Sequence, residues 1–532
     1  METGFLEQPL QSASADGTHA PLTVLDLFDQ QVQKTPHHIA VQYEESTLTY
    51  RELDEKSNQL AQILISQGIT QDVSIPICVE RSLEMIVGIL GILKSGAAYT
   101  PISPHTPGKR INDILQNLEA TRLLTQSSLS DKFKSIRGLN ILNIDDPSLS
   151  TETTKKPMRN ISMKNLIYII YTSGSTGRPK GAMNVHDALC NRIVWMQNLL
   201  QLDHSDIVLH KTPFDFDVSF WEFFLPLTTG ASIHIMPPEQ HQNPEKIARI
   251  IKQYGITVIH FIPSMLAAFL KNTSLKCHSL KYVICSGEPL SFKLQQSCLQ
   301  RFPWIKLYNF YGPTEAAIDV TYFFCNQSQY CDKVPIGKPI SNVSTYILTH
   351  DLQKVRQNEI GELYLGGIAL ARGYLNNPTL TAEKFIENPF GSGRLYRTGD
   401  LVRELPDGNL EFIGRIDDQV KIRGFRIEPS EITACLLTHP SIDQAIVLSK
   451  ESSEHEKYLV AFVVFKHGQT GSATQLITHL KQTVPSYMIP ALFFALDHLP
   501  LNQTGKIDRA QLRSLDEQNA LPVTTYQPPE TD

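Results

Sequence analysis

Short apolar runs alternate with helical patterns along most of the chain. Four runs have the length and composition of buried strands: residues 207–209, 233–236, 257–261 and 282–285. Residues 243–254 have helical periodicity and lie between the second and third of these strands. Near the N-terminus, Thr49 and Glu52 have capping-box spacing. A helical face follows them, lined by Leu53, Leu60, Ile63 and Leu64. This alternation predicts α/β layers around a largely parallel sheet.

The composition of the chain changes near residues 414–424, which have the densely charged sequence GRIDDQVKIRG. After it, the pattern predicts a helix from Pro429, strands over 445–448 and 459–465, and a helix near 474–484. This mixed α+β content indicates a second domain. We therefore expect a loose leader over 1–20, a large domain over 21–416, a small domain over 417–515 and a linker-like tail over 516–532.

Composition narrows the class of protein. The 532 residues are 41% hydrophobic and 19% charged, which is typical of a multidomain globular chain. A net charge of −6 is small for this length and argues against a nucleic-acid partner. No apolar run approaches the roughly 18 residues of a membrane span. The first basic residue is Lys34, so the N-terminus lacks the positive charge of a signal peptide. The eight cysteines form no CxxC pair, which suits reduced thiols rather than a disulfide framework or a zinc site. We expect a cytoplasmic protein without a membrane partner.

Residues 171–181, with the sequence YTSGSTGRPKG, directly follow the apolar run 166–170. Glycines allow backbone N–H groups to converge on an anion, and hydroxyl groups and Lys180 add donors and charge. The segment is not a Walker A loop, because no Gly-Lys-Ser/Thr follows Gly174 at the required spacing. The pattern therefore predicts either a phosphate-binding loop or an ordinary Gly/Ser turn, and composition alone leaves both open.

The segment SGSTGRPKG resembles the signature loop of the adenylate-forming superfamily, which comprises acyl-CoA synthetases, luciferases and nonribosomal peptide synthetase adenylation domains. Further segments resemble the motifs of that family, occur in its order and cover nearly the whole chain. They are LTYREL (48–53), LKSGAAYTPISP (93–104), FDVS (216–219), NFYGPTE (309–315), GELYLGG (361–367), YRTGDL (396–401), GRIDDQVKIRGFRIE (414–428) and LNQTGKIDR (501–509). The resemblance implies a large N-terminal domain of layered α/β subdomains and a small, mobile α+β C-terminal domain.

The resemblance is closest to the peptide synthetase adenylation domains, and it implies an amino-acid adenylating ligase of secondary-metabolite biosynthesis. Such an enzyme converts an amino acid and ATP into an aminoacyl-adenylate and pyrophosphate. It then passes the acyl group to the phosphopantetheine thiol of a carrier protein, in cis or in trans. Because the first step brings two anions together, its catalysis depends on positioning and positive charge.

The same resemblance assigns roles to individual residues. Lys506 matches the catalytic lysine, Glu315 the Mg²⁺ ligand and Asp417 a hinge whose rotation withdraws Lys506 after adenylation. Tyr311 would pack on adenine, Asn309 would bond its amino edge, and Asp400 with Arg415 would take the ribose. The full set implied for ATP is Thr172, Ser173, Gly174, Ser175, Thr176, Gly177, Lys180, Gly287, Asn309, Phe310, Tyr311, Gly312, Thr314, Asp400 and Arg415. Taken singly, several of these also fit turn or core positions.

Asp217 bears on the choice of acid. In amino-acid-activating members of the family, an aspartate here pairs with the substrate ammonium. If the segment is helical, Asp217 and Trp221 share one face; the alternative role for Asp217 is a helix N-cap. The implied pocket resembles that of serine-activating domains and consists of Asp217, Val218, Trp221, His260, Ile284, Ser286, Phe310, Ile318, Asp319 and Lys506.

That resemblance implies L-serine as substrate, and the chemistry agrees, because His260, Ser286 and Asp319 are polar groups available to a small side chain. Several alternatives stay open. His260 and Ser286 also fit satisfied core positions, and Asp319 also suits the side-chain ammonium of 2,3-diaminopropionate. Another small amino acid is a further alternative substrate. A free acyl-CoA ligase of the same fold and a non-catalytic binding module are the rival functions. Asp217 argues against the first, and the intact Lys506, Glu315 and Asp400 argue against the second.

Overall fold

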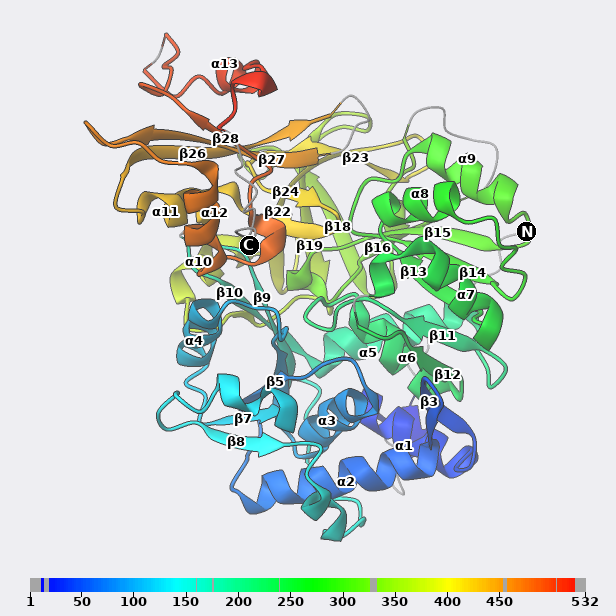
Figure 1. The fold of residues 1–532 in the computed structure, drawn as a ribbon. Coiled ribbons are helices and arrows are strands. Elements are labelled where there is room, and N and C mark those ends of the chain that lie inside the picture. The colour runs from blue at the N-terminus through cyan, green and yellow to red at the C-terminus, as the bar shows by residue number, and fades with distance from the viewer. Residues whose placement is uncertain are drawn as a thin grey trace. The chain divides into compact units, whose positions relative to one another are not determined.

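The computed structural model describes residues 11–13, 19–158, 160–174, 177–238, 240–325, 333–452, 457–503 and 505–521. The chain forms two compact units (Figure 1). The first comprises Met1–Pro104, Leu118–Ile170 and Gly181–Ile416, and the second comprises His105–Asn117, Tyr171–Lys180 and Asp417–Asp532. Two internal segments of the expected large domain thus group with the second unit. Along the chain, the last change from the first unit to the second occurs between Ile416 and Asp417.

A seven-stranded sheet forms one layer of the first unit, in the order β20-β10-β9-β6-β5-β7-β8. Its strands are β5 (Ser74–Cys78), β6 (Ala98–Pro101), β7 (Arg122–Thr125), β8 (Asn140–Asn143), β9 (Leu166–Thr172), β10 (Lys180–Val185) and β20 (Gly373–Tyr374). Helices α2 (Tyr50–Ser66) and α3 (Leu83–Lys94) pack against each other beside it (Figure 1). The predicted capping box of α2 is confirmed, because the Thr49 hydroxyl accepts the Glu52 N–H and Glu52 accepts the Thr49 N–H.

A nine-stranded sheet forms a second layer, in the order β17-β16-β15-β14-β13-β11-β12-β3-β4. Its strands are β3 (Ile39–Tyr43), β4 (Ser46–Thr49), β11 (Ile207–His210), β12 (Ser232–Ile235), β13 (Val258–Phe261), β14 (Tyr282–Cys285), β15 (Lys306–Tyr311), β16 (Thr321–Cys325) and β17 (Lys338–Pro339). The four predicted strands are confirmed to within about one residue and pair in parallel, as expected. Helix α7 (Pro244–Tyr254) confirms the predicted helix, and Asn243 caps it. It packs on α8 (Pro263–Asn272), which contacts α9 (Phe292–Arg301) (Figure 1).

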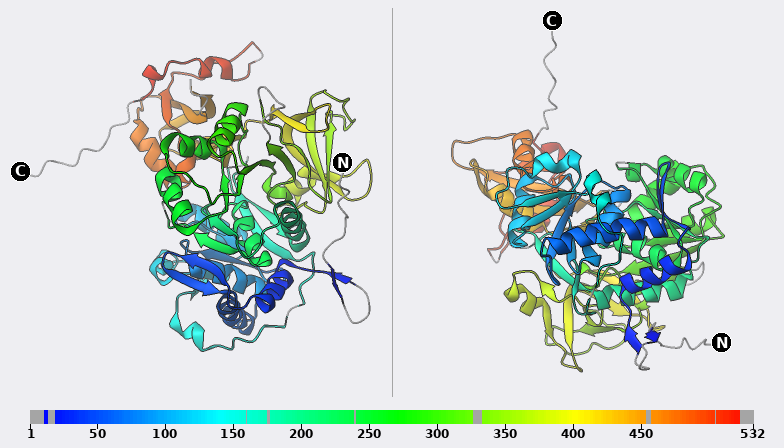
Figure 2. Two further views of the ribbon diagram at one scale, coloured as in Figure 1. Left: turned by 90° about the vertical axis from the view of Figure 1, so that its right-hand side faces the viewer. Right: turned by 90° about the horizontal axis from the view of Figure 1, so that it is seen from below.

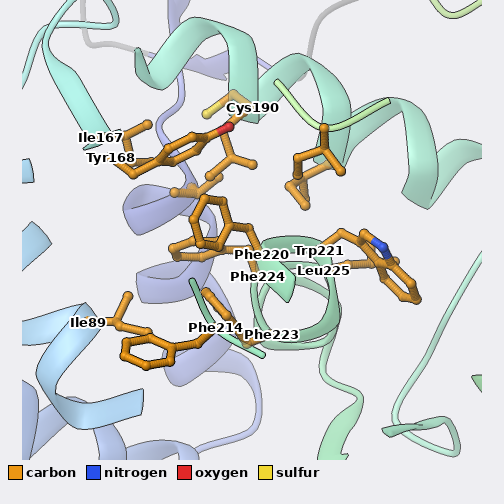
Figure 3. Close-up of a cluster of buried hydrophobic side chains, with 14 of the residues drawn as sticks. Ile89, Ile167, Tyr168, Cys190, Phe214, Phe220, Trp221, Phe223, Phe224 and Leu225 are labelled. Carbon is orange, nitrogen blue, oxygen red and sulfur yellow. The ribbon is translucent and has the colours of Figure 1, made fainter. Parts of the chain in front are cut away.

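Aromatic side chains of helix α6 (Ser219–Thr229) fill the core of the first unit. The Phe220 ring lies 4.2 Å from Tyr168 and 5.7 Å from Phe223, measured between centroids. Trp221 leaves the helix on another side, away from this ring cluster (Figure 3). Helix α6 contacts α1 (Val24–Lys34) and α5 (His186–Leu200). Trp221 is also completely buried, so α6 is enclosed on this side as well.

Two further groups of strands complete the first unit. A small antiparallel sheet contains β18 (Val343–Leu348), β19 (Gly361–Gly367), β21 (Phe385–Glu387), β22 (Arg394–Glu404) and β23 (Leu410–Arg415), with α10 (Pro378–Lys384) beside it. These strands gather as the yellow-green sheet of Figure 2. In the expected leader, β1 (Gln11–Ala13) pairs with β2 (His19–Pro21), and the rest of residues 1–18 lies outside the described residues.

The second unit is built around the sheet β26-β27-β28, formed by β26 (Ile442–Glu451), β27 (Lys457–Phe465) and β28 (Leu492–Ala495). It also contains α4 (Gly108–Asn117), the ribbon β24 (Val420–Ile422) and β25 (Phe425–Ile427), α11 (Pro429–Leu437), α12 (Ala473–Lys481) and α13 (Arg509–Arg513). The predicted helices and strands after residue 428 are present. Of the expected tail, residues 522–532 lie outside the described residues.

Candidate active site

Several predicted pocket residues meet where the parallel strands β13, β14 and β15 end. His260 lies opposite Ile284 in the register of β13 and β14, Ser286 follows β14 directly, and Phe310 lies near the end of β15. Because carboxyl ends of adjacent parallel strands share one edge of a sheet, these four residues are brought together. All four residues are at most 2% exposed, so their side chains are buried inside the first unit.

The polar members of this group are hydrogen-bonded. Nε2 of His260 lies 2.9 Å from the Ser286 hydroxyl oxygen. Burial, together with the charge of Lys211, lowers the pKa of His260 to about 3, so the imidazole is neutral near pH 7. The Trp221 ring lies edge-on to His260, with centroids 6.3 Å apart. Its Nε1–H is buried and has no hydrogen-bond partner among the described residues.

Asp217 does not lie on a helix. It sits in a turn before α6, and Val218 occupies the N-cap position, so neither the shared helical face with Trp221 nor the N-cap role is present. The turn arises because the Phe216 N–H bonds the Pro213 carbonyl and the Phe220 N–H bonds the Asp217 carbonyl. Burial, with the Asp217 charge as a smaller cause, raises the pKa of the Tyr168 hydroxyl well above its ordinary value. Asp217 is itself 8% exposed and so supplies a mostly buried negative charge.

Asp319 has a charge partner that the sequence did not suggest. Its Oδ2 lies 2.8 Å from Nη2 of Arg192, on helix α5, and the two side chains are 3% and 1% exposed. The Arg192 guanidinium also lies over the rings of Trp195 and Phe310, at 4.9 and 5.1 Å from their centroids. Its Nε and Nη1 have no hydrogen-bond partner among the described residues. The negative charge of Asp319 is therefore already balanced inside the core.

The backbone before Asp319 is strained. Ile318 has φ +81°, a conformation that β-branched residues rarely adopt. Gly312 fits closely here, because a Cβ on it would lie 2.3 Å from the Ile318 carbonyl oxygen and 2.5 Å from the Asp319 Cα. A side chain at position 312 would push this loop away. Gly312 and the strained turn thus fix the positions of Ile318 and Asp319.

Tyr311, Asp400 and Arg415 form a second cluster in the first unit. Nη1 of Arg415 lies 2.5 Å from Oδ1 of Asp400, and the Tyr311 hydroxyl donates to Oδ2. Asp400 and Arg415 are opposite each other in the register of β22 and β23. Burial, with the Asp400 charge as a smaller cause, raises the pKa of Tyr311 well above its ordinary value, so its hydroxyl keeps the proton it donates. Each carboxylate oxygen of Asp400 retains acceptor capacity.

Glu315 lies close to Tyr311 in sequence and is completely buried. The Tyr374 hydroxyl donates to its Oε1 at 2.7 Å. A carboxylate beside nucleotide phosphates is the oxygen donor that Mg²⁺ accepts, so this residue fits a shared metal site. Among the described residues no group of three or more His, Cys, Asp and Glu forms a self-contained metal site. The backbone carbonyl of Thr314 accepts a hydrogen bond from the Asn184 side chain, and the Asn309 side-chain amide donates to the Pro335 carbonyl.

The predicted phosphate loop belongs to the second unit, and its residues Ser175 and Thr176 lie outside the described residues. The Ser173 hydroxyl donates to the Arg426 carbonyl and accepts the Glu428 N–H, at 2.8 and 3.1 Å. The Gly174 N–H donates to a Glu431 carboxylate oxygen at 3.0 Å, so a backbone donor of the loop already binds an anionic group. The other described members are Thr172, Gly177, with φ +81°, and Lys180.

Lys506 and Asp417 also belong to the second unit. Lys506 is exposed and closes a tight turn, in which the Asn502 N–H donates to the Lys506 carbonyl at 2.7 Å and Gly505 has φ +76°. Asp417 is exposed and accepts the Gln419 N–H at 3.2 Å. Gly287, with φ +86°, follows Ser286 in the first unit. The predicted residues thus divide between the units: those around His260 and those around Asp400 lie in the first, and the predicted phosphate loop and Lys506 lie in the second.

Comparison with known proteins identifies the family. Residues 28–375 match the AMP-binding enzyme family, and residues 431–506 match the C-terminal domain of AMP-binding enzymes. The chain belongs to the AMP-binding enzyme family. This confirms the adenylate-forming fold, with its large N-terminal and small C-terminal domains, and identifies the chain as a ligase.

Two relatives are similar to this AMP-binding enzyme over most of its length. It is 47% identical over 506 residues to one of the mycosubtilin synthase proteins from Bacillus subtilis, a match covering 92% of this chain and 19% of that protein. It is 42% identical over 505 residues to zwittermicin A synthase ZmaJ from Bacillus cereus, covering 92% and 94%. The chain therefore spans only a small part of the first relative and nearly all of the second.

Solved structures give the same result. NpsA-ThdA, an artificially fused adenylation–PCP di-domain from Klebsiella oxytoca, matches with a TM-score of 0.79 and 28% identity, covering 88% of this chain and 93% of that one. An o-succinylbenzoate CoA synthetase from Bacillus subtilis matches with a TM-score of 0.81 at 22% identity, covering 93% and 99%, which indicates a shared fold. The chain is thus an adenylation domain of the nonribosomal peptide synthetase type.

Two other expectations from composition can be compared with the structure. The seven cysteines among the described residues are buried and unpaired, as expected of reduced thiols. No helix in the described part of the chain is long and apolar enough to cross a membrane.

Proposed function

We propose that this adenylation domain activates L-serine as seryl-adenylate, with release of pyrophosphate, and then passes the seryl group to a carrier-protein thiol. The observation that carries the substrate assignment is the buried His260–Ser286 pair, with its 2.9 Å hydrogen bond, at the carboxyl ends of β13 and β14. A pocket wall of two small polar groups suits a hydroxymethyl side chain. It disfavours the apolar methyl of alanine, which would leave the remaining lone pairs of the Ser286 oxygen without a partner.

The charges around the pocket support a neutral side chain. Asp217 supplies a negative charge for the substrate ammonium, which a fatty or aryl acid lacks. Asp319 is the group that suits 2,3-diaminopropionate, but Arg192 already balances its charge at 2.8 Å. A second ammonium would have to compete with a buried guanidinium for this carboxylate. This favours serine over the diamino acid.

In the proposed first reaction, a carboxylate oxygen of serine attacks the α-phosphorus of ATP and the bond to the β-phosphate oxygen breaks. Asp400, held by Arg415 and Tyr311, would accept the ribose hydroxyls. Lys506 would supply the positive charge that the two approaching anions require. Glu315 would hold Mg²⁺, which neutralises phosphate charge when bound. The residues of the phosphate loop, from Thr172 to Lys180, are proposed to bind the departing pyrophosphate.

In the proposed second reaction, the thiol of a phosphopantetheine arm attacks the seryl carbonyl and loses its proton, and AMP leaves. The similarity to an adenylation–PCP di-domain supports a carrier-protein partner. Asp417 is proposed as the hinge between the two reactions, at the passage between the units after Ile416. A proline at 417 that left both half-reactions at wild-type rates would contradict the hinge role.

The substrate is tested by ATP–pyrophosphate exchange with each proteinogenic amino acid, 2,3-diaminopropionate, a fatty acid and an aryl acid. Serine is expected to give the fastest exchange, with alanine and glycine far slower and threonine in between, since its extra methyl is excluded only sterically. The Lys506→Ala variant is the control for a catalytic site. Exchange that depends on a fatty or aryl acid would indicate a free acyl-CoA ligase. No exchange with any acid, in the variant and the wild type alike, would indicate a binding module.

A further inference from the structure

A line of buried hydrogen bonds runs from the pocket wall into the core of the first unit. Behind the Ser286–His260 contact, Nδ1 of His260 lies 3.5 Å from the Thr212 hydroxyl oxygen. That oxygen lies 2.6 Å from Oε1 of Glu222, on helix α6. Thr212 is 9% exposed and Glu222 is completely buried. We call Ser286, His260, Thr212 and Glu222 the hydroxyl relay.

The inner end of the hydroxyl relay is an acceptor. Oε2 of Glu222 receives the backbone N–H groups of Lys211 and Thr212, at 3.2 and 3.1 Å, and lies 2.9 Å from Nδ1 of His210. Burial alone would raise the pKa of Glu222, but the nearby His210 and the charge of Lys211 hold it below its ordinary value. Glu222 is therefore an ionised carboxylate with no proton to donate.

This fixed end sets the direction of every bond in the hydroxyl relay. A hydroxyl has one proton, and Thr212 must give its proton to Glu222, so its oxygen can only accept from His260. Nδ1 of His260 then carries the ring proton. Since the imidazole is neutral, its Nε2 bears a lone pair and can only accept. The Ser286 proton is thereby used, and the lone pairs of its oxygen are left for the pocket.

We propose that the hydroxyl relay makes Ser286 a dedicated hydrogen-bond acceptor, and that Thr212 and Glu222 are positioning residues that select substrates whose side chain donates a hydrogen bond. This inference rests on the proposed function, since it assumes that the pocket binds serine. It adds a distinction that size and polarity alone do not make. A side chain that only accepts hydrogen bonds is rejected like an apolar one.

The test uses serine, alanine and 3-fluoroalanine, whose fluorine is small and cannot donate. The wild type should discriminate against 3-fluoroalanine almost as strongly as against alanine, by a factor of about 100 or more in kcat/KM for pyrophosphate exchange. Thr212→Val removes the acceptor from Nδ1 and frees the tautomer of His260. The ratio of serine to 3-fluoroalanine should then fall at least tenfold.

Matched variants separate this effect from a general loss of structure. Thr212→Ser keeps the hydroxyl and should restore the wild-type ratio. Glu222→Gln keeps the shape but can offer either an N–H or an oxygen to Thr212, so its ratio should also fall. An unchanged ratio in Thr212→Val and Glu222→Gln, or a parallel loss of all three substrates in both, would overturn the relay while serine activation stands. A wild type that does not activate serine would overturn both proposals.

Discussion

Replacing Asp319 by alanine would leave the Arg192 guanidinium buried without its counter-charge. The two side chains are 3% and 1% exposed, and the pair has a 2.8 Å contact. The guanidinium keeps only its contacts with the Trp195 and Phe310 rings, at 4.9 and 5.1 Å, since Nε and Nη1 have no hydrogen-bond partner among the described residues. Those ring contacts are present before and after the change, so they do not compensate for the lost carboxylate.

The magnitude follows from this burial. Removing one partner of a buried ion pair costs about 3–5 kcal/mol, because the remaining charge stays desolvated. Replacing both partners by apolar residues of similar volume is close to neutral. We therefore expect Asp319→Ala to lower the free energy of unfolding of the first unit by about 3–5 kcal/mol, and Arg192→Met/Asp319→Leu to lower it by much less.

Urea unfolding followed by tryptophan fluorescence measures both variants, because Trp195 and Trp221 lie in this core. The single variant Arg192→Met adds a functional readout. With the guanidinium gone, Asp319 is free to pair with an ammonium, so the ratio of 2,3-diaminopropionate to serine in kcat/KM should rise. A loss below about 1 kcal/mol for Asp319→Ala would contradict a buried ion pair with Arg192, as would a double variant no more stable than the single one.

Three further predictions concern other parts of the first unit. Thr49→Ala removes the α2 capping box and should lower the free energy of unfolding by about 1 kcal/mol, seen as a lower Tm without loss of activity; no change in Tm would contradict it. Tyr311→Phe removes the hydroxyl that donates to Asp400 and should raise the KM for ATP several-fold while leaving the KM for serine unchanged, and a parallel rise in both would contradict a nucleoside role. Burial lowers the pKa of Lys211 to about 8 from an ordinary 10.5. Between these two pH values, Lys211 binds a proton in the unfolded chain but not in the folded one, so the free energy of unfolding rises with pH. Relative to Lys211→Met, it should rise by about 2 kcal/mol from pH 8 to pH 10. A difference between the two proteins that does not change with pH would contradict this.

Local patterns predicted the elements well because their causes are local. The strand over Tyr282–Cys285 and the helix from Pro244 follow from apolar runs and from Asn243 as a cap. The capping box at Thr49 needs only residues three apart. Asp217 was the exception, because backbone bonds from Phe216 to Pro213 make a turn where helical spacing allowed a helix.

Long-range partners in the site could not be predicted in this way. Arg192 and Asp319 are 127 residues apart in sequence, and only the fold brings them together. Glu222 is the single acidic residue in the apolar run FWEFFLPL, which indicates that its buried charge needs a partner. The sequence does not show that Thr212 and His210 lie beside it, because this depends on the packing of β11 against α6. The resemblance to the family predicted which residues would line a pocket, whereas the hydrogen-bond partners of those residues required the structure.

The proposed product of this adenylation domain is seryl-adenylate. The most direct measurement is the mass of the nucleotide product formed from ATP and an equimolar mixture of amino acids that includes 2,3-diaminopropionate, with Lys506→Ala in parallel. We expect seryl-adenylate to be the dominant adenylate from the wild type and to be severely reduced in the Lys506→Ala variant. A dominant adenylate of any other amino acid, or equal yields from wild type and Lys506→Ala, would contradict it.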